Sequence, residues 1–229
     1  MSQTAESTDV HNQTATKSPA PRRRQSRWRL LIVSIASVAA LVLIWEEFVK
    51  YRVIAKRWGV VVPGQIYRSG QISKWVLPGK LQEHGIEVVV DLTNIVPDDI
   101  HQQAEIATLK RLGIEHHRFR LTGDGSGDIQ NYANAIGMLA KCEQDGRPVL
   151  VHCAAGAQRT GGVVATYRVL VRGDSPSDAY AELSRYGWKA HKDQRLLTYL
   201  NGHMRELAQL LVERGVIDRV PDPLPVVGP

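Results

Sequence analysis

The sequence contains few cysteine residues and no internal repeat. Its 229 residues include two cysteines, Cys142 and Cys153, too few for the disulfide framework of a small secreted domain. Cysteine and histidine residues do not occur together at metal-ligand spacings, so the sequence predicts no metal site. A chain of this length can bury a core of its own and form one catalytic domain with accessory segments.

Strong charge is also missing from most of the chain. The net charge is +6, but residues 1–29 carry six basic residues against two acidic ones, and residues 30–45 carry no charge. The remainder, residues 46–229, is therefore close to neutral. That balance argues against a nucleic-acid partner.

The N-terminal region has almost nothing to bury. Residues 1–21 are mostly Ser, Thr, Gln, Asn and Ala, and a cluster of arginines follows, so we expect a disordered basic segment over residues 1–29. The uncharged run of residues 30–45 is short for a bilayer span, which needs about 20 apolar residues, but Trp28 and Trp45 flank it as interfacial anchors do. We interpret the run as a single transmembrane helix, followed by a juxtamembrane linker over residues 46–59.

The alternatives to an anchor are a cleaved signal peptide and a buried core helix. A signal peptide has an apolar core of about 7–15 residues and a small-residue cleavage site, whereas this run ends in Trp45-Glu46-Glu47-Phe48. We therefore favour a single-pass membrane protein. Basic residues lie on both sides of the run, so the positive-inside rule leans only slightly toward a cytoplasmic N-terminus. A reactive thiol suits a cytoplasmic catalytic domain instead, and the side of the membrane stays open.

Strand and helix patterns alternate from residue 60 onward. Short apolar runs predict strands, and longer segments with helical spacing predict helices between them. We expect strands at 60–62, 66–68, 87–92, 115–121 and 148–151, and helices at 74–84, 98–112, 129–144, 161–170, from 174 and at 193–214. This alternation predicts an α/β fold with a mostly parallel central sheet flanked by helices. The domain is expected over residues 60–215, with a loose Pro-rich tail over residues 216–229.

One stretch carries a chemical pattern. His152-Cys153-Ala154-Ala155-Gly156-Ala157-Gln158-Arg159-Thr160 follows an apolar strand and precedes a helix. In such a loop the backbone N–H groups can converge on an anion, and the dipole of the following helix favours negative charge. The same surroundings lower the pKa of a cysteine toward roughly 3.5–7.5, which makes Cys153 a nucleophile.

Other residues of the stretch are of types that suit a phosphate group. Arg159 offers the planar, two-pronged donor geometry that a lysine does not reproduce. Gly156 permits the turn, and Thr160 lies where its hydroxyl can assist a departing thiolate. The residues expected to surround the phosphate are Ala154, Ala155, Gly156, Ala157, Gln158 and Arg159.

The stretch resembles the His-Cys-x-x-Gly-x-x-Arg-Thr loop of the protein tyrosine phosphatase superfamily. The segments Ile66-Tyr67-Arg68-Ser69-Gly70-Gln71, Val88-Val89-Val90-Asp91-Leu92 and Asp193-Gln194 are similar to segments of the compact dual-specificity-like phosphatases, so the resemblance covers roughly residues 60–200. It implies the cysteine phosphatase fold, a phosphocysteine intermediate on Cys153, and no metal or organic cofactor. It also implies that His152 orients the loop by hydrogen bonding.

Cleavage of a phosphate ester through a cysteine needs an acid to protonate the leaving oxygen. The glycine-rich loop over residues 122–128 supplies Asp124 and Asp128. Asp124 lies at about the spacing at which the family carries its general acid, and we favour it. Asp128 is the alternative acid, although it is well placed to cap the helix that begins at Ile129. Asp124 in turn could be a simple turn residue.

The alanines of the loop bear on the substrate. The relatives that resemble phosphoinositide or inositol pyrophosphate phosphatases tend to carry basic residues at these positions, and extra phosphates need extra cations. We therefore expect a phosphorylated protein, with phosphotyrosine or dual specificity, as the substrate. Arg68, Lys189 and Lys192 are interpreted as solvated surface charges rather than as further phosphate ligands.

Some alternatives stay open at this point. A phosphoinositide is the alternative substrate, and a phosphate-binding pseudophosphatase is the alternative from another class of function. Cys142 is an ordinary helix cysteine or the partner of Cys153 in a regulatory disulfide. The sequence does not indicate an oligomeric state.

Overall fold

The computed structural model describes residues 22–45 and 49–228 of the chain. The chain divides into two compact units, residues 1–45 and residues 46–229. The expectation of disorder for residues 1–21 lies outside the described residues.

The first unit contains one long helix, α1 (Arg22–Ile44). It begins inside the segment expected to be disordered, because arginine is a good helix former and the helix extends back from the apolar run. The large apolar side chains along residues 30–45 are exposed. Among the described residues, no helix is long and apolar enough to cross a membrane, and the transmembrane anchor stays a prediction.

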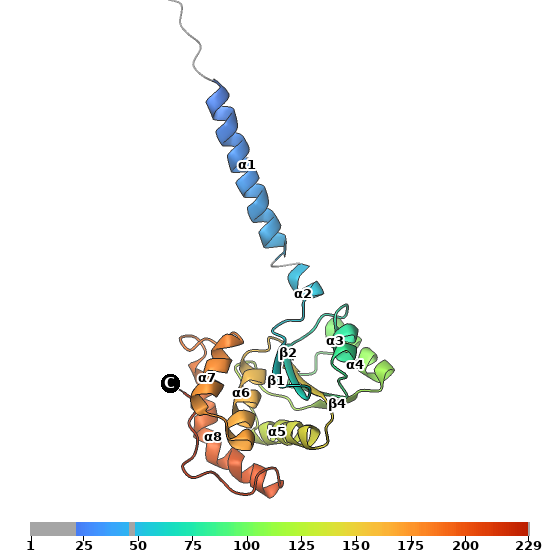
Figure 1. The fold of residues 1–229 in the computed structure, drawn as a ribbon, viewed down its shortest axis with the longest axis vertical. Coiled ribbons are helices and arrows are strands. Elements are labelled where there is room, and N and C mark those ends of the chain that lie inside the picture. Colours follow the sequence, from blue (N-terminus) through green and yellow to red (C-terminus); the bar gives the residue numbers. More distant parts are fainter. Residues whose placement is uncertain (1–21, 46–48, 229) are drawn as a thin grey trace, which may run out of the picture. The chain divides into compact units, whose positions relative to one another are not determined.

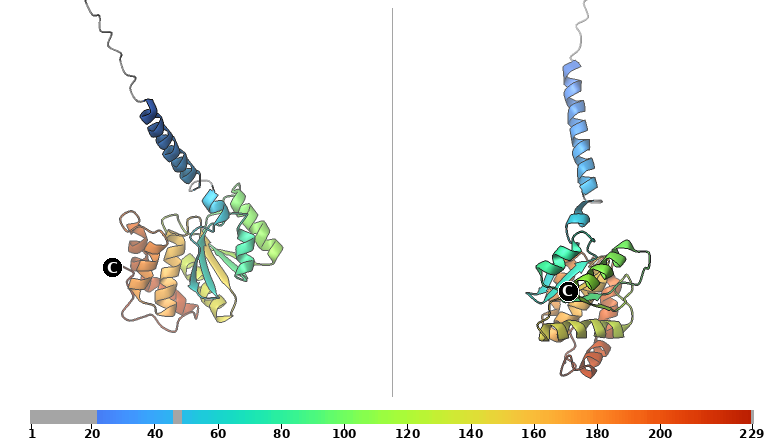
Figure 2. Two further views of the ribbon diagram at one scale, coloured as in Figure 1. Left: turned by 45° about the horizontal axis from the view of Figure 1, so that its top comes forward. Right: turned by 90° about the vertical axis from the view of Figure 1, so that its right-hand side faces the viewer.

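The second unit is built on a five-stranded sheet with the order β1-β2-β5-β3-β4. The strands are β1 (Gly59–Val62), β2 (Ile66–Gly70), β3 (Val88–Asp91), β4 (Glu115–Arg118) and β5 (Val149–Cys153). Only β1 runs antiparallel to its neighbour; the other pairings are parallel. The predicted α/β class with a mostly parallel sheet is therefore confirmed, and Figures 1 and 2 show the helices that flank it.

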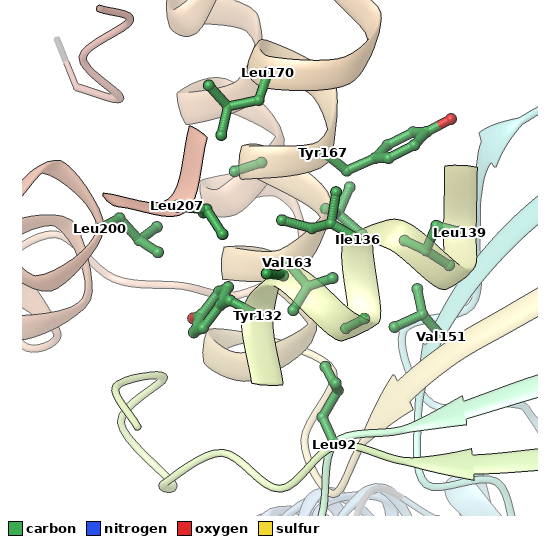
Figure 3. Close-up of a cluster of buried hydrophobic side chains, with 14 of the residues drawn as sticks. Leu92, Tyr132, Ile136, Leu139, Val151, Val163, Tyr167, Leu170, Leu200 and Leu207 are labelled. Atoms are coloured by element: carbon green, nitrogen blue, oxygen red, sulfur yellow. The ribbon is translucent and has the colours of Figure 1, made fainter. Parts of the chain in front are cut away.

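Alternating side chains of the central strands enter two separate cores. Val88, Val90 and Val151 pack with one set of helices, whereas Val89 and Leu150 pack with another on the opposite face. The first set comprises α5 (Ile129–Gln144), α6 (Gln158–Tyr167), its continuation η2 (Arg168–Arg172), α7 (Pro176–Arg185) and α8 (Gln194–Glu213), and the second α3 (Leu77–Glu83) and α4 (Ile100–Leu112). A sheet covered on both faces explains the continuous apolar runs of its strands. Figure 3 shows part of the larger core.

The carboxyl ends of three parallel strands meet at one edge of the sheet. Gly70 of β2 pairs with Cys153 of β5, and Asp91 of β3 pairs with His152. The loops that follow these strands are therefore neighbours, which is where open α/β sheets place their sites.

The segment before β1 and the tail after α8 are more ordered, in the described residues, than the sequence indicates. The expected linker contains α2 (Lys50–Val53), and after it Ala55 is buried and Trp58 stacks on Tyr67. The expected loose tail folds back, because Val227 is fully buried and its backbone exchanges two hydrogen bonds with the side-chain amide of Asn201.

Candidate active site

The cysteine stretch forms a tight turn between a strand and a helix. Strand β5 ends at Cys153 and α6 begins at Gln158. Gly156 has a φ of +75°, and a Cβ atom at this position would lie 2.5 Å from the backbone nitrogen of Gly70. Only glycine fits there, because both the conformation and the close approach to β2 exclude a side chain. The predicted strand–loop–helix arrangement is thus present.

The sulfur of Cys153 lies inside this turn. The backbone N–H of Gly156 donates to Sγ at 3.1 Å. Burial raises the pKa of the thiol, but the hydroxyl and N–H of Thr160, the charge of Arg159 and the N–H of Gly156 together lower it further than burial raises it. The net result is a pKa below the usual value for cysteine, so the site favours the nucleophilic thiolate.

Arg159 and Thr160 lie in the first turn of α6. Arg159 Nη1 donates to the carbonyl of Leu92 at 3.3 Å, which fixes the guanidinium at the end of β3. Its Nε is buried and has no hydrogen-bond partner among the described residues. The hydroxyl of Thr160 lies 3.5 Å from the carbonyl of Ser69. A buried donor without a partner is costly unless a ligand accepts from it, so Arg159 suits an anion above the loop.

The interpretation of Arg68 as a surface charge is wrong. Its side chain is 1% exposed, and Nη1 forms an ion pair with Glu182 of α7 at 2.8 Å. Nη2 donates to the carbonyl of Gly156 at 3.3 Å, and the guanidinium lies over the ring of Tyr186. Arg68 therefore supports the loop from behind, and both of its terminal nitrogens are engaged. The sequence contains one indication of this role, because Arg68 lies in the segment over residues 66–71 that is similar to a segment of the dual-specificity-like phosphatases.

Asp124 lies on a loop that packs against the cysteine turn. A Cβ atom at Gly125 would lie 3.3 Å from the backbone of Gln158, and the hydroxyl of Tyr132 donates to the carbonyl of Gly125. The carboxylate of Asp124 accepts from the hydroxyl of Thr122 at 2.6 Å and that of Ser126 at 2.7 Å. These two hydroxyls are the main cause of a pKa lowered to about 2. Asp124 therefore lies on a loop next to the site, and its neighbours favour the ionised form of its carboxyl group.

Asp128 has the capping geometry. It is the N-cap of α5, and its Oδ1 accepts from the backbone N–H of Gln130 at 2.9 Å. This bond occupies one side of its carboxylate with a structural task. The assignment of Asp124 as the general acid stays a prediction.

A buried charge network lies behind the nucleophile. His152 Nε2 lies 2.8 Å from a carboxylate oxygen of Glu105 on α4, rather than bonding the loop as the resemblance implied. Burial lowers the pKa of His152, but Glu105 and then Asp91 raise it more strongly, to about 9. Arg118 in turn pairs with Asp91 at 2.7 Å. Sequence spacing gave no signal for Glu105, because the contact joins a helix to a strand 47 residues later.

Three members of this network are close enough together to hold a metal ion. The ligand atoms of Asp91, Glu105 and His152 lie within 4.8 Å of one another. The guanidinium of Arg118 lies against Asp91, and the raised pKa of His152 favours the protonated ring, which cannot ligate a metal. We interpret the group as an ion-pair network.

Cys142 has the environment of a core residue. It is 1% exposed on α5, and burial raises its pKa to about 11. A thiol that stays protonated is a poor nucleophile. This observation favours the ordinary helix cysteine over the redox partner.

The parallel sheet, the strand that ends in a cysteine and the helix that begins beside an arginine have the arrangement of the cysteine-based phosphatase fold. The family model for the dual specificity phosphatase catalytic domain matches residues 70–211. The chain belongs to this family, within the superfamily that the cysteine stretch resembles.

Curated relatives match a short part of the chain. The dual specificity protein phosphatase OPG106 of vaccinia virus is 39% identical over 61 residues, which cover 26% of this chain and 36% of the viral protein. The protein of the same name from monkeypox virus is 38% identical over 61 residues with the same coverage. The chain thus spans about a third of the length of these relatives.

Solved structures match a larger part. TpbA of P. aeruginosa, in complex with pTyr, has a TM-score of 0.53 and 22% identity and covers 69% of this chain and 95% of its own. The core catalytic domain of the PP-IP phosphatase SIW14 of S. cerevisiae has a TM-score of 0.55 and 20% identity and covers 76% of this chain and 99% of its own. At these identities the likeness shows the fold.

Proposed function

We propose that this phosphatase hydrolyses phosphate monoesters on proteins, with phosphotyrosine or dual specificity. In the first step the thiolate of Cys153 attacks phosphorus, the bond to the leaving oxygen breaks, and Asp124 donates the proton to that oxygen. In the second step water attacks the phosphocysteine, Asp124 takes up a proton of the water, and the sulfur leaves with help from Thr160. The loop N–H groups and Arg159 stabilise the charge on the transferred phosphoryl group.

One observation carries this proposal: a thiol with a lowered pKa sits beside a converging N–H group and an unpartnered buried donor of Arg159. Asp124 enters the reaction protonated, although its present neighbours favour the carboxylate. Rotation of the Asp124 side chain away from the hydroxyls of Thr122 and Ser126, together with the charge of a phosphate dianion, raises the pKa of its carboxyl group.

The loop favours a substrate with a single phosphoryl group. Ala154, Ala155 and Ala157 bring no cation to it, and Arg68 is occupied by Glu182. The P. aeruginosa protein of the same fold binds pTyr in its structure. Together these observations support a phosphotyrosine-type protein substrate.

A phosphoinositide is the second candidate, and one observation favours it. The charge of Cys153 acts on Lys56, which lies before β1 and is within reach of the loop: a Cβ atom at Gly70 would lie 3.1 Å from Lys56 Cδ and 2.8 Å from the Ala155 carbonyl. One extra cation suits a second phosphate, and SIW14 is a PP-IP phosphatase of the same fold. Turnover of a panel of phosphopeptides and phosphoinositides distinguishes the two substrates.

The first experiment is hydrolysis of p-nitrophenyl phosphate by residues 46–229. We expect vanadate-sensitive turnover that disappears in the Cys153→Ser variant. Absence of turnover in the unchanged protein would support a phosphate-binding pseudophosphatase instead. Turnover that survives Cys153→Ser would exclude the cysteine mechanism.

We further propose that residues 30–45 attach the enzyme to a membrane as a single-pass anchor. The support is the uncharged run itself and the exposure of its large apolar side chains in α1, which water does not favour. The side on which the catalytic domain lies is open, and a reporter fused to either end determines it.

A further inference from the structure

Three successive carbonyl groups of the cysteine turn are held from outside. The carbonyl of Ala154 accepts from the backbone N–H of Gln71 at 3.2 Å. The carbonyl of Ala155 accepts from Nη1 of Arg57 at 2.7 Å, and that of Gly156 from Arg68. Because the C=O and N–H of one trans peptide point in opposite directions, carbonyls held outward turn the N–H groups inward.

The bond from Arg57 acts on one peptide in particular. The carbonyl of Ala155 and the N–H of Gly156 belong to the same peptide unit, and this N–H donates to the sulfur of Cys153 at 3.1 Å. A cationic donor on the oxygen of a peptide polarises the unit and strengthens the bond that its N–H donates. Arg57 is thereby connected to the nucleophile through a single peptide plane.

Arg57 is itself held in an unusual conformation. Its φ is +49°, and it is the only residue other than glycine among those described with a positive φ. The preceding carbonyl of Lys56 accepts from the backbone N–H of Gly70 at 2.7 Å. Its guanidinium fills the space beside Gly187, where a Cβ atom would lie 2.7 Å from Nε. A strained backbone fixed by its neighbours next to a site is a sign of a functional constraint.

We propose that Arg57 is a positioning residue of the phosphatase reaction, which acts through the Ala155–Gly156 peptide to hold the N–H group that stabilises the Cys153 thiolate. The proposal rests on the proposed function for its effect on turnover. It also assigns a task in the active site to the segment between α2 and β1, which the sequence indicated only as a linker.

Other charged groups act on the same sulfur. They are Arg159 on α6, His152 on β5, Arg68 on β2 and Lys56 beside Arg57. Loss of Arg57 therefore weakens the stabilisation of the thiolate without abolishing it. The expected effect is smaller than the loss of about a hundredfold or more that follows removal of a direct oxyanion donor.

The test uses the full chain with Arg57→Gly, Arg57→Lys and, as a matched control, Arg52→Ala at an exposed site on α2. Glycine removes the donor and relieves the positive φ, so folding is preserved. We expect Arg57→Gly to lower kcat/KM for p-nitrophenyl phosphate about tenfold and to shift the pH profile of iodoacetamide alkylation of Cys153 upward. We expect Arg57→Lys to recover part of the lost kcat/KM and to reverse part of the shift in the alkylation profile. Arg52→Ala is expected to change neither quantity.

Alkylation is measured alongside thermal melting, because a merely structural role would lower the melting temperature without moving the alkylation profile. A wild-type profile and wild-type kcat/KM in a folded Arg57→Gly variant would overturn the proposal. If the unchanged protein shows no turnover, the proposed function fails, while the alkylation profile still decides whether Arg57 acts on the thiolate.

Discussion

In the proposed mechanism the carboxyl group of Asp124 is an acid in the first step and a base in the second, and its surroundings in the structure favour only the ionised form that the second step needs. With a pKa of about 2, held there by Thr122 and Ser126, it is ionised at neutral pH. An acid role thus depends on a substrate-bound arrangement of the loop. The close packing of Gly125 on Gln158 provides the route by which the cysteine turn and this loop influence each other.

Replacement of Asp124 by asparagine tests its role as the general acid. We expect Asp124→Asn to lower kcat about a hundredfold, because general acid catalysis contributes roughly 10²–10⁴. The measurement is steady-state hydrolysis of phosphotyrosine peptides, whose leaving group needs a proton.

Asp128→Asn is the matched control for this variant. Asparagine caps helices about as well as aspartate, so both the stability of α5 and the activity are expected to stay near those of the unchanged protein. A large loss for Asp128→Asn with little loss for Asp124→Asn would reverse the assignment.

The buried side chain of His152 makes the free energy of unfolding depend on pH, in a direction that its pKa determines. The folded pKa of His152 is about 9, whereas an unfolded histidine titrates near 6.5, so the folded state binds the proton more tightly. Its contribution to the free energy of unfolding, roughly 3 kcal/mol at most, is complete below about pH 6.5 and is lost as the pH rises through 9. Removal of the charge of Glu105 removes most of this contribution.

Urea unfolding of the unchanged protein and of Glu105→Gln, at about pH 6 and about pH 10, measures the effect. We expect the unchanged protein to be more stable than the variant at the lower pH, and the difference to shrink at the higher pH. A difference that is independent of pH would show that Glu105 acts on stability by packing alone.

The sequence revealed the site residues that lie close together along the chain. Cys153, Gly156, Arg159 and Thr160 lie within one turn, where spacing alone places the sulfur, the bend and the cation together. The supporting contacts of Arg57 and Glu105 join segments far apart in the chain. A local sequence pattern does not predict such contacts, because they depend on how the strands are ordered in the sheet.

Among the elements, α7 supplies the acidic partner of Arg68, the residue of β2 that supports the cysteine turn. Its Glu182 is 7% exposed and pairs with Arg68 of β2 and with Arg168 of η2. The buried pair with Arg68 joins a helix to a strand, and Arg68 continues to the carbonyl of Gly156. A break in this pair leaves a charge buried without its partner.

We therefore expect Glu182→Ala to lower the free energy of unfolding by about 3–5 kcal/mol. The control is Asp145→Ala, which breaks the exposed pair between Lys141 and Asp145 and changes stability by only about 0.5 kcal/mol. Urea unfolding of both variants compares the two ion pairs directly. Equal, small changes would mean that Arg68 finds another partner or solvent.

The helices and strands between residues 60 and 214 followed closely from periodicity, since each element buries one face or both against a neighbour. The ends did not. Val227 is buried because the tail returns to Asn201 on α8, and the Pro-rich composition of the tail gives no sign of that return. The sequence also underestimates the order of the segment before β1. Ala55 and Trp58 pack into the smaller core while the neighbouring Val53 and Ile54 are exposed, so hydrophobicity does not show which of these residues is buried.

On the scale of the whole molecule, the two units differ in how far their apolar side chains are buried. The unit over residues 46–229 buries its apolar side chains in two cores, whereas the large apolar side chains of α1 are about half exposed or more. Hydrophobic surface of this kind is favourable only when lipid or another protein covers it. In the proposed membrane anchor, lipid covers the apolar side chains of α1.

Fractionation of the full chain and of residues 46–229 tests the anchor. We expect the full chain to stay with membranes after alkaline washing and to be released by detergent, and residues 46–229 to stay in the supernatant. Val38→Arg places a charge in the middle of the apolar run, where it opposes insertion by about 2.5–3.5 kcal/mol, whereas Val38→Leu preserves the run. Release of the full chain by alkaline washing, or equal behaviour of the two Val38 variants, would contradict a spanning helix and leave a protein partner as the cover for α1.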